Sequence, residues 1–264
     1  MSLLTWIAWT AGLSSAVMVV AWVMQRRLND AGIVDVLWSG SLGIAAIGAA
    51  IVGEGDPLRR MVLNVIAVMW SFRLTLYLLT DRILKAERED GRYQMLRQKW
   101  GDSAQVWLFV FFQAQAFFVV AFAIPFYVVA QNPLPLGWLD GLGVAIWIIA
   151  MGGETLADLQ LSRHRADPAN QGKTCRSGLW RYSRHPNYFF EWLHWWSYVF
   201  LGLGSAWWYL APSAAMFMLF LLFFITGIPY TEQRAIVSRG QDYIDYQNET
   251  CVFIPWFPKR KMTP

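Results

Sequence analysis

The chain has 264 residues, of which 56% are hydrophobic, 16% aromatic and 15% charged, with a formal net charge of +4. Soluble domains carry about 25% charged residues on average, so this composition excludes a disordered protein, a disulfide-stapled secreted domain and an ordinary cytosolic enzyme. The two cysteines, Cys175 and Cys251, are too few for a disulfide framework or a metal quartet. We therefore expect a multi-pass membrane protein.

Seven segments reach the roughly 20 mostly apolar residues that a spanning helix needs. In chain order they are 3–24, 33–53, 61–80, 105–130, 137–157, 189–210 and 211–229. The first is not expected to be a signal peptide, because its apolar stretch is long and lacks a basic start. The predicted fold is an all-α bundle of seven transmembrane helices in a single domain over 1–264.

The positive charges alternate between successive loops. Lys and Arg number two in 25–32, six in 81–104, six in 158–188 and five after 230, whereas loop 131–136 has none. By the positive-inside rule, the N-terminus is expected outside and the C-terminus in the cytoplasm. The basic 81–104 run is expected to lie against the lipid headgroups.

Familiar soluble-enzyme motifs are absent from the sequence. It contains no GxGxxG, P-loop, HExxH or GxSxG pattern, and the three histidines show no metal-ligand spacing with carboxylates or cysteines. We expect no metal and no nucleic-acid partner. Any cofactor must then be bound by the membrane helices and their cytoplasmic loops.

Polar residues gather in three segments of the second half, Glu154–Arg165, Gly178–Glu191 and Pro229–Arg234. Ionisable residues at membrane depth are costly and indicate function, so these segments predict a polar pocket at the cytoplasmic mouth.

The start of the sixth predicted span suits a bound ligand. Pro186 is expected in the first turn of that helix, where its missing N–H costs nothing. The free N–H groups there, beside Arg184 and His185, suit an anion. Asn187 and Glu191 lie four residues apart and share a helix face, so they could hold a carboxamide or a purine edge.

The first half carries a smaller polar set. Asp35 and Trp38 share one face of the second predicted span, Arg73 lies inside the third, and Arg82 ends it. One interpretation is a substrate-facing cluster. The alternative is an Asp35–Arg73 pair that only holds the helices together.

At these residues the chain resembles the steroid 5α-reductase family in its bacterial branch. The resemblance covers most of the chain and is most specific over 150–258, including Arg184-His185-Pro186-Asn187-Tyr188 and a tail that leads to Phe253-Ile254-Pro255. The wider superfamily, with sterol reductases and isoprenylcysteine methyltransferases, shares this C-terminal pattern. The 5α-reductases are favoured by the seven predicted spans and by the polar residues of the first half, Asp35, Arg73 and Arg82.

The resemblance implies NADPH as cofactor and a division into a substrate-pocket half, 1–104, and a mainly cofactor-binding half, 105–264. The implied cofactor contacts are Arg73, Arg82, Asp158, Arg165, Tyr182, Arg184, His185, Asn187, Glu191, Tyr230 and Arg234. Asn187 and Glu191 would face the nicotinamide, and the arginines would bind phosphates through bidentate contacts.

The expected reaction is NADPH-dependent reduction of the enone of a Δ4-3-ketosteroid or a similar lipophilic substrate. The predicted catalytic residues are Asp35, Trp38, Tyr77 and Glu191. A desolvated Asp35, kept protonated inside the membrane, would stabilise the charge that develops on the carbonyl oxygen. The family places a tyrosine where this chain has Trp70, so Tyr77 is the candidate replacement.

Two other functions stay open. One is an S-adenosylmethionine-dependent methyltransferase of the isoprenylcysteine type, which needs fewer arginines for its cofactor than NADPH does. The other is a non-catalytic lipid- or sterol-binding protein. The protein is expected to act as a monomer in the bacterial inner membrane, or in the endoplasmic reticulum if eukaryotic.

Overall fold

The structure is a computed structural model that describes residues 1–85, 88–225 and 227–259. Across these residues the secondary structure is helical and includes no strand, which confirms the predicted all-α class. Six helical stretches of the described chain are long and apolar enough to cross a membrane: Leu3–Leu28, Ile33–Val52, Pro57–Leu84, Gly91–Ala130, Trp138–Ala166 and Trp208–Arg239.

The predicted span 189–210 is interrupted. Helix α7 runs from Pro186 to Gly202 and has 17 residues, fewer than the roughly 20 that a span needs. The chain then turns at Gly204, whose φ of +96° is a conformation that residues with a Cβ rarely adopt. Seven spans, and the sides on which the termini lie, stay predictions.

The chain divides into two compact units. Unit 1 comprises Met1–Asp140 and Tyr198–Ala214, and unit 2 comprises Gly141–Ser197 and Ala215–Pro264. The functional halves 1–104 and 105–264 stay a prediction; the long helix after residue 104 packs with the first two helices in unit 1.

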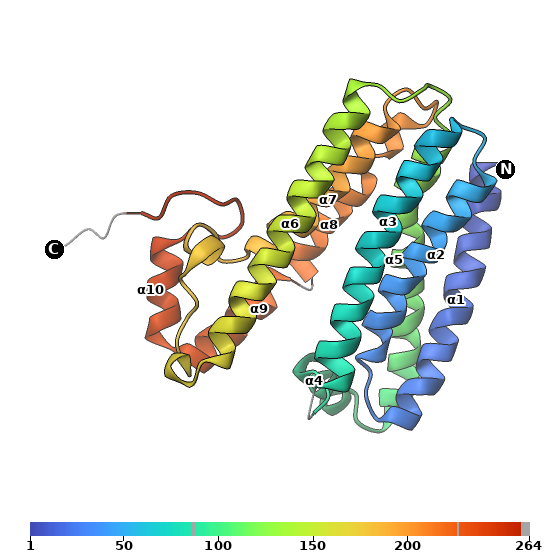
Figure 1. The fold of residues 1–264 in the computed structure, drawn as a ribbon. Helices are drawn as coiled ribbons and strands as arrows, with labels where there is room; N and C mark the ends of the chain where they lie inside the picture. The colour runs from blue at the N-terminus through green and yellow to red at the C-terminus, as the bar shows by residue number, and fades with distance from the viewer. Residues whose placement is uncertain (86–87, 226, 260–264) are drawn as a thin grey trace. The chain divides into compact units, whose positions relative to one another are not determined.

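Unit 1 is a bundle of long helices (Figure 1). It contains α1 (Leu3–Leu28), α2 (Ile33–Val52), α3 (Pro57–Leu78), the π-helix η1 (Leu79–Leu84), α4 (Gly91–Trp100) and α5 (Ala104–Ala130). α2 packs against α3 and α5, and α1 packs against α5. Gly43 permits the close approach of α2 and α3, since a Cβ there would lie 3.0 Å from Cβ of Ser71.

A buried ion pair closes one end of unit 1. The side chains of Arg59, at the start of α3, and Asp140 are 2% and 8% exposed and form a salt bridge. The Arg59 guanidinium also donates to the carbonyls of Leu201 at 2.6 Å, Pro135 at 3.2 Å and Leu134 at 3.2 Å. No local sequence pattern joins Arg59 to Asp140, because the two residues are 81 positions apart.

Unit 2 contains most of α6 (Trp138–Ala166) and of α7, with α8 (Ser213–Phe220), the π-helix η6 (Leu221–Ile225), α9 (Ile228–Arg239) and α10 (Gln241–Glu249). α7 begins at Pro186, as predicted. The chain after α10 brings Phe253 into an aromatic cluster, with ring centroids 5.7 Å from Phe189, 5.6 Å from Trp192 and 5.3 Å from Phe223. This cluster ties the C-terminal segment to α7 and η6.

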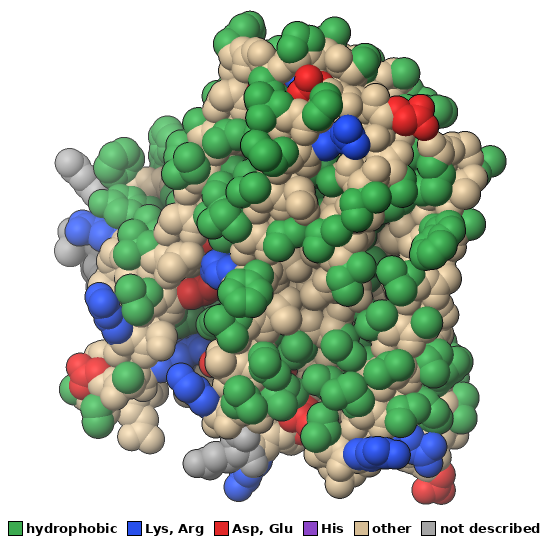
Figure 2. Space-filling view, turned by 45° about the vertical axis from the view of Figure 1, so that its right-hand side comes forward, with side chains coloured by type: hydrophobic (Ala, Val, Ile, Leu, Met, Phe, Trp, Pro, Cys, Tyr) green, Lys and Arg blue, Asp and Glu red, His purple; other side chains and the backbone are tan. Residues whose placement is uncertain are grey.

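Large hydrophobic side chains cover the outside of the long helices. Phe72 is 67% exposed, Phe117 64% and Ile149 58%, and Figure 2 shows hydrophobic side chains spread over the face that it draws. A water-soluble protein rarely exposes so much contiguous apolar surface. Together with the six apolar helices, this surface shows an integral multi-pass membrane protein in contact with the bilayer.

Candidate cofactor site

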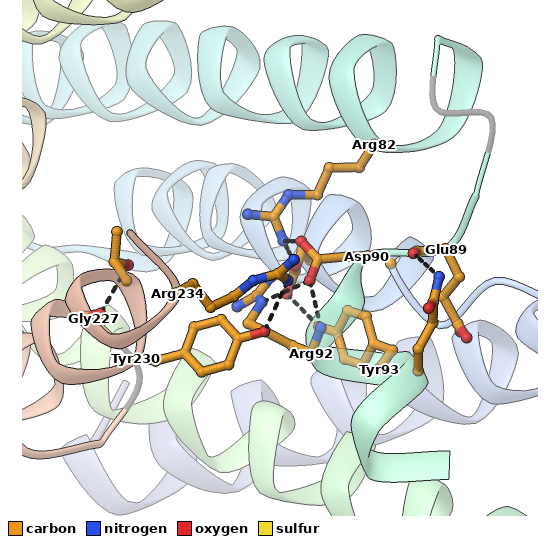
Figure 3. Close-up of polar contacts among 12 residues, drawn as sticks. Arg82, Glu89, Asp90, Arg92, Tyr93, Gly227, Tyr230 and Arg234 are labelled. Carbon is orange, nitrogen blue, oxygen red and sulfur yellow. Dashed lines mark hydrogen bonds and ion pairs between the residues drawn. The ribbon is translucent and has the colours of Figure 1, made fainter. Parts of the chain in front are cut away.

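A cluster of charges lies where η1 and α4 meet α2 in unit 1. We call Asp35, Arg82, Asp90, Arg92 and Tyr93 the Asp35 cluster, and Figure 3 shows the last four converging. The Asp35 carboxylate accepts hydrogen bonds from Arg82, from Arg92 at 3.0 Å and from the Tyr93 hydroxyl at 2.9 Å. Asp90 adds a second carboxylate, 3.2 Å from Arg92.

This geometry bears on the catalytic role expected of Asp35, which stays a prediction. Two guanidinium groups and the Tyr93 hydroxyl already contact the Asp35 carboxylate, so these contacts compete with a hydrogen bond to a substrate carbonyl. Arg82, predicted to bind a cofactor phosphate, pairs with Asp35 and Asp90. The predicted alternative partner of Asp35 was Arg73, whereas the structure gives Asp35 the partners Arg82 and Arg92.

A second set of contacts anchors the basic segment before α5. Glu89 accepts from Arg97 at 3.0 Å and from the backbone N–H of Ala31 at 2.7 Å, and Arg97 also donates to Gln25. The segment is thus joined by side-chain contacts to the ends of α1 and α2. We conclude that its charges serve internal pairing as well as any headgroup contact.

The other predicted residues of unit 1 lie along α2 and α3. Trp38 is on α2, and its indole ring packs edge-on against Phe122, with centroids 5.7 Å apart. Its Nε1–H is buried and has no hydrogen-bond partner among the described residues. Arg73 and Tyr77 lie on α3, with Tyr77 40% exposed.

A hydrogen-bonded group of side chains in unit 2 joins the start of α7 to α9 and α10. It consists of Arg184, His185, Glu232 and Gln247, and we call it the Arg184 cluster. Arg184 donates to Glu232 at 2.6 Å and to the backbone carbonyls of Gln247 and Thr250, both at 2.9 Å. Gln247 donates to the other oxygen of Glu232 at 2.8 Å. Arg184 is therefore committed to internal contacts and offers less to an anion than predicted.

His185 is the buried member of the Arg184 cluster. Its Nε2 lies 3.2 Å from Glu232, and its ring stacks on Tyr188 with a centroid distance of 5.2 Å. Burial lowers the pKa of His185; the hydrogen bond and the charge of Glu232 oppose this shift, whereas the nearby Arg184 reinforces it. The imidazole is therefore expected to be neutral in the folded protein at neutral pH.

We expect the thermal stability to fall as the pH drops below about 6.5, the ordinary pKa of histidine. The unfolded chain binds a proton at His185 near that pH, while the folded chain resists protonation until its lower pKa is reached. Unfolding midpoints between about pH 8 and pH 5 should show this slope. The slope should flatten in His185→Gln and persist in His164→Gln, whose histidine is only partly buried; equal slopes in all three proteins would contradict the assignment.

The predicted ligand-facing residues, Asn187 and Glu191, both lie on α7 within unit 2. The Asn187 side-chain amide donates to Asp158 of α6 at 3.2 Å, so these two residues lie together although they are 29 positions apart. Glu191, one turn further along α7, accepts from the indole N–H of Trp195 at 3.3 Å. An oriented amide beside two carboxylates is able to hold a group with both donors and acceptors, such as a carboxamide or an adenine edge.

The loop before α7 is held tightly against α6. The indole of Trp180 donates to the carbonyl of Ala157 at 2.9 Å, and Gln160 accepts from the N–H of Leu179 at 2.8 Å. Burial raises the pKa of Tyr246, whose hydroxyl donates to the carbonyls of Trp180 and Ser183. The loop is therefore fixed from both sides.

Gly178 begins this loop, and we expect Gly178→Ala to destabilise the protein by about 1–3 kcal/mol. Its φ is +60°, and a Cβ there would collide with the Gln160 side chain. Gly172→Ala is the matched control, because Gly172 has a φ of +74° but no atom within 4 Å of a built Cβ. If thermal unfolding shows the same loss of stability for both variants, the collision with Gln160 does not contribute to the effect.

Several predicted cofactor contacts lie on the surface of unit 2. Arg165 and two further arginines, Arg163 and Arg181, are exposed and form no hydrogen bond or ion pair with another described residue. Arg234 donates to the Tyr230 hydroxyl at 3.2 Å, as Figure 3 shows. These basic groups are the ones in unit 2 best placed to meet phosphates from solvent.

The predicted cofactor residue Tyr182 contacts the C-terminal segment: its backbone carbonyl accepts a hydrogen bond from the N–H of Trp256 at 2.9 Å. Its ring packs edge-on against Phe257, with centroids 6.0 Å apart.

Unit 2 fits a phosphorylated nucleotide cofactor in two respects. It offers an oriented amide–carboxylate group at Asp158, Asn187 and Glu191, and a separate supply of exposed arginines. The described residues contain no group of three or more His, Cys, Asp or Glu side chains able to hold a metal. The pairing of Glu232 with Arg184 was not predicted, because the two residues are 48 positions apart and no local pattern joins them.

Comparison with known proteins gives one match. A family model described as "Protein of unknown function (DUF1295)" matches residues 21–250. No curated protein and no solved structure matches the chain significantly.

Proposed function

The chain belongs to the DUF1295 family, and on that premise we propose that it is an NADPH-dependent membrane reductase of an enone C=C bond in a lipophilic substrate, such as a Δ4-3-ketosteroid. The resemblance of the sequence to the steroid 5α-reductase family supports this class. The observation that carries the proposal is the contact of Asn187 with Asp158, one turn from Glu191, since the resemblance assigns these three residues to the cofactor.

In this proposal NADPH supplies the hydride when it is bound. Asn187, oriented by Asp158, and Glu191 bind the carboxamide end of the cofactor. The exposed Arg163, Arg165 and Arg181 bind the phosphates, to which guanidinium groups are suited through paired N–H donors. Arg184 and His185 keep the start of α7 in place through Glu232 rather than contacting the anion.

The group that stabilises the substrate carbonyl is reassigned. Asp35 is occupied by Arg82, Arg92 and Tyr93, so we assign the donor role in unit 1 to the Nε1–H of Trp38. A buried donor without a partner is costly, and a carbonyl oxygen that gains negative charge would satisfy it. Because the substrate partitions into lipid, a membrane-embedded donor suits it.

The proposal is tested by turnover. Detergent-purified protein supplied with NADPH and testosterone or progesterone should consume NADPH and yield a product heavier by two hydrogen atoms. Glu191→Ala should abolish the reaction, and Trp38→Phe, which keeps the ring and removes the donor, should lower kcat more than it changes KM. Arg27→Ala, on an exposed site of α1, is the control. Activity that survives Glu191→Ala would exclude this site.

A second candidate is an S-adenosylmethionine-dependent methyltransferase. The observation that favours it is the pairing of Arg82 with Asp35 and Asp90, because this pairing removes one of the arginines that favoured NADPH. A sulfonium cofactor has no phosphates to neutralise, so the arginines at 163, 165 and 181 would then be dispensable for binding.

A further inference from the structure

A cavity of about 110 Å³ lies within unit 1, between α1, α2 and α5. Its walls include Trp6 and Leu13 of α1, Ala45 and Gly48 of α2, and Val119 of α5. The cavity exists because α2 presents small residues to α1. A Cβ on Gly48 would be 3.5 Å from the ring of Trp6, so that ring already occupies the space nearest the glycine.

The Trp6 side chain, which forms one wall of the cavity, is held in place by contacts with Tyr127. Its ring stacks on Tyr127, with centroids 6.1 Å apart and planes at 25°, and the Tyr127 hydroxyl donates to the carbonyl of Met1 at 2.9 Å. Two serines also line the cavity, but both are satisfied by helix carbonyls. Ser14 donates to Thr10 at 2.7 Å and Ser41 donates to Leu37 at 2.7 Å.

Water is a poor occupant of this cavity. A buried water needs two to four polar partners, whereas apolar cavities of about 150 Å³ stay dry and bind small hydrocarbons such as benzene. With Ser14 and Ser41 engaged, Thr10 is the one wall hydroxyl left without a hydrogen bond to another described residue. The interior therefore favours hydrocarbon.

The rim of the cavity meets the lipid. Trp9, Leu13 and Ile44 are 68%, 44% and 50% exposed, and they belong to helices α1 and α2, which are long and apolar enough to span a membrane. From Trp6 to Val17 the wall extends about 16 Å along α1 at 1.5 Å per residue, which is about half of the hydrocarbon core. Trp side chains are enriched at the headgroup level of membranes, so Trp6 and Trp9 mark the end nearest the headgroups.

We propose that this cavity is a binding site for one acyl chain of a bilayer phospholipid. The chain enters past Trp9, with its headgroup at the level of the two tryptophans and its methylene groups against Ala45, Gly48 and Val119. The proposal concerns unit 1 alone and requires neither cofactor nor turnover, so it stands or fails independently of the proposed reductase.

The test is photolabelling of the whole protein in phosphatidylcholine vesicles that contain a fraction of lipid with a diazirine on its acyl chain. After irradiation, adducts mapped by mass spectrometry should be severalfold more abundant on the segments 6–17 and 41–48 than on 65–72 of α3, which also exposes apolar side chains. Ala45→Phe, which fills the cavity, should reduce the excess severalfold. Ile47→Phe, on the exposed side of the same helix, should not.

Equal labelling of the three segments, or an excess that survives Ala45→Phe in a folded protein, would overturn the proposal. If Ala45→Phe fails to fold, Gly48→Ala provides the milder variant, since its new Cβ would be in ordinary contact with Trp6. Its labelling should lie between that of the wild type and the background of 65–72, and an unchanged excess would again contradict the site.

Discussion

Replacement of Arg59 by methionine is expected to destabilise the protein by about 3–5 kcal/mol, because it leaves the buried carboxylate of Asp140 without its charge partner. The substitution also removes the donor to the carbonyls of Leu134, Pro135 and Leu201. Among the described residues, only the N–H of Gly137, at 2.7 Å, would still donate to the Asp140 carboxylate. The loss should appear as a lower unfolding midpoint and earlier proteolysis in detergent.

Two further variants separate the charge effect from the lost packing. Arg59→Met combined with Asp140→Leu removes both charges, so it should recover a large part of the stability. The recovery should be incomplete because the three carbonyls stay without a donor. Arg60→Met is the matched control, since the one described hydrogen bond of its side chain goes to the carbonyl of Ala50 at 3.0 Å. If Arg59→Met is no worse than Arg60→Met, the buried pair is not a principal source of stability.

Asp35→Asn is expected to cost about 2–4 kcal/mol and to loosen α4, because an amide cannot balance two guanidinium groups. Asp35 holds Arg82 of η1 and both Arg92 and Tyr93 of α4. The variant should therefore be cleaved faster near residues 91–100 in limited proteolysis, and its unfolding midpoint should fall.

Asp102→Asn serves as the control, because Asp102 is exposed in the turn between α4 and α5. A variant Asp35→Asn that keeps wild-type stability and proteolysis but loses all turnover would contradict our account. That result would restore Asp35 to the catalytic role that the sequence suggested.

The helices were largely predictable from composition. Apolar runs such as 3–24 and 33–53 agree with α1 and α2 within a few residues, because a spanning helix must satisfy all of its backbone hydrogen bonds internally and offer apolar side chains to lipid. The helix that begins at Pro186 was also predictable, since the position of proline in a first turn is a local effect. The early end of α7 at Gly202 was not, because its continuing apolar run masked the turn around Gly204.

The polar sites were predictable only where the pattern is local. The shared face of Asn187 and Glu191 follows from helix geometry. By contrast, Arg59–Asp140 and Arg184–Glu232 are separated by 81 and 48 residues, and a single sequence does not indicate which charges will meet. The contacts of Asp35 were not predictable for the same reason, because its partners Arg92 and Tyr93 lie 57 and 58 residues away.

Cofactor selectivity is the most direct test of the central claim that unit 2 binds NADPH. The measurement compares binding of NADPH, NADH and S-adenosylmethionine to the detergent-purified protein and to Glu191→Ala, Arg165→Ala and the control Arg27→Ala. We predict selective NADPH binding that is lost in Glu191→Ala, weakened about tenfold or more in Arg165→Ala by loss of a charge-assisted phosphate contact, and retained in Arg27→Ala. Selective binding of S-adenosylmethionine, unaffected by Arg165→Ala, would contradict the reductase and favour the methyltransferase.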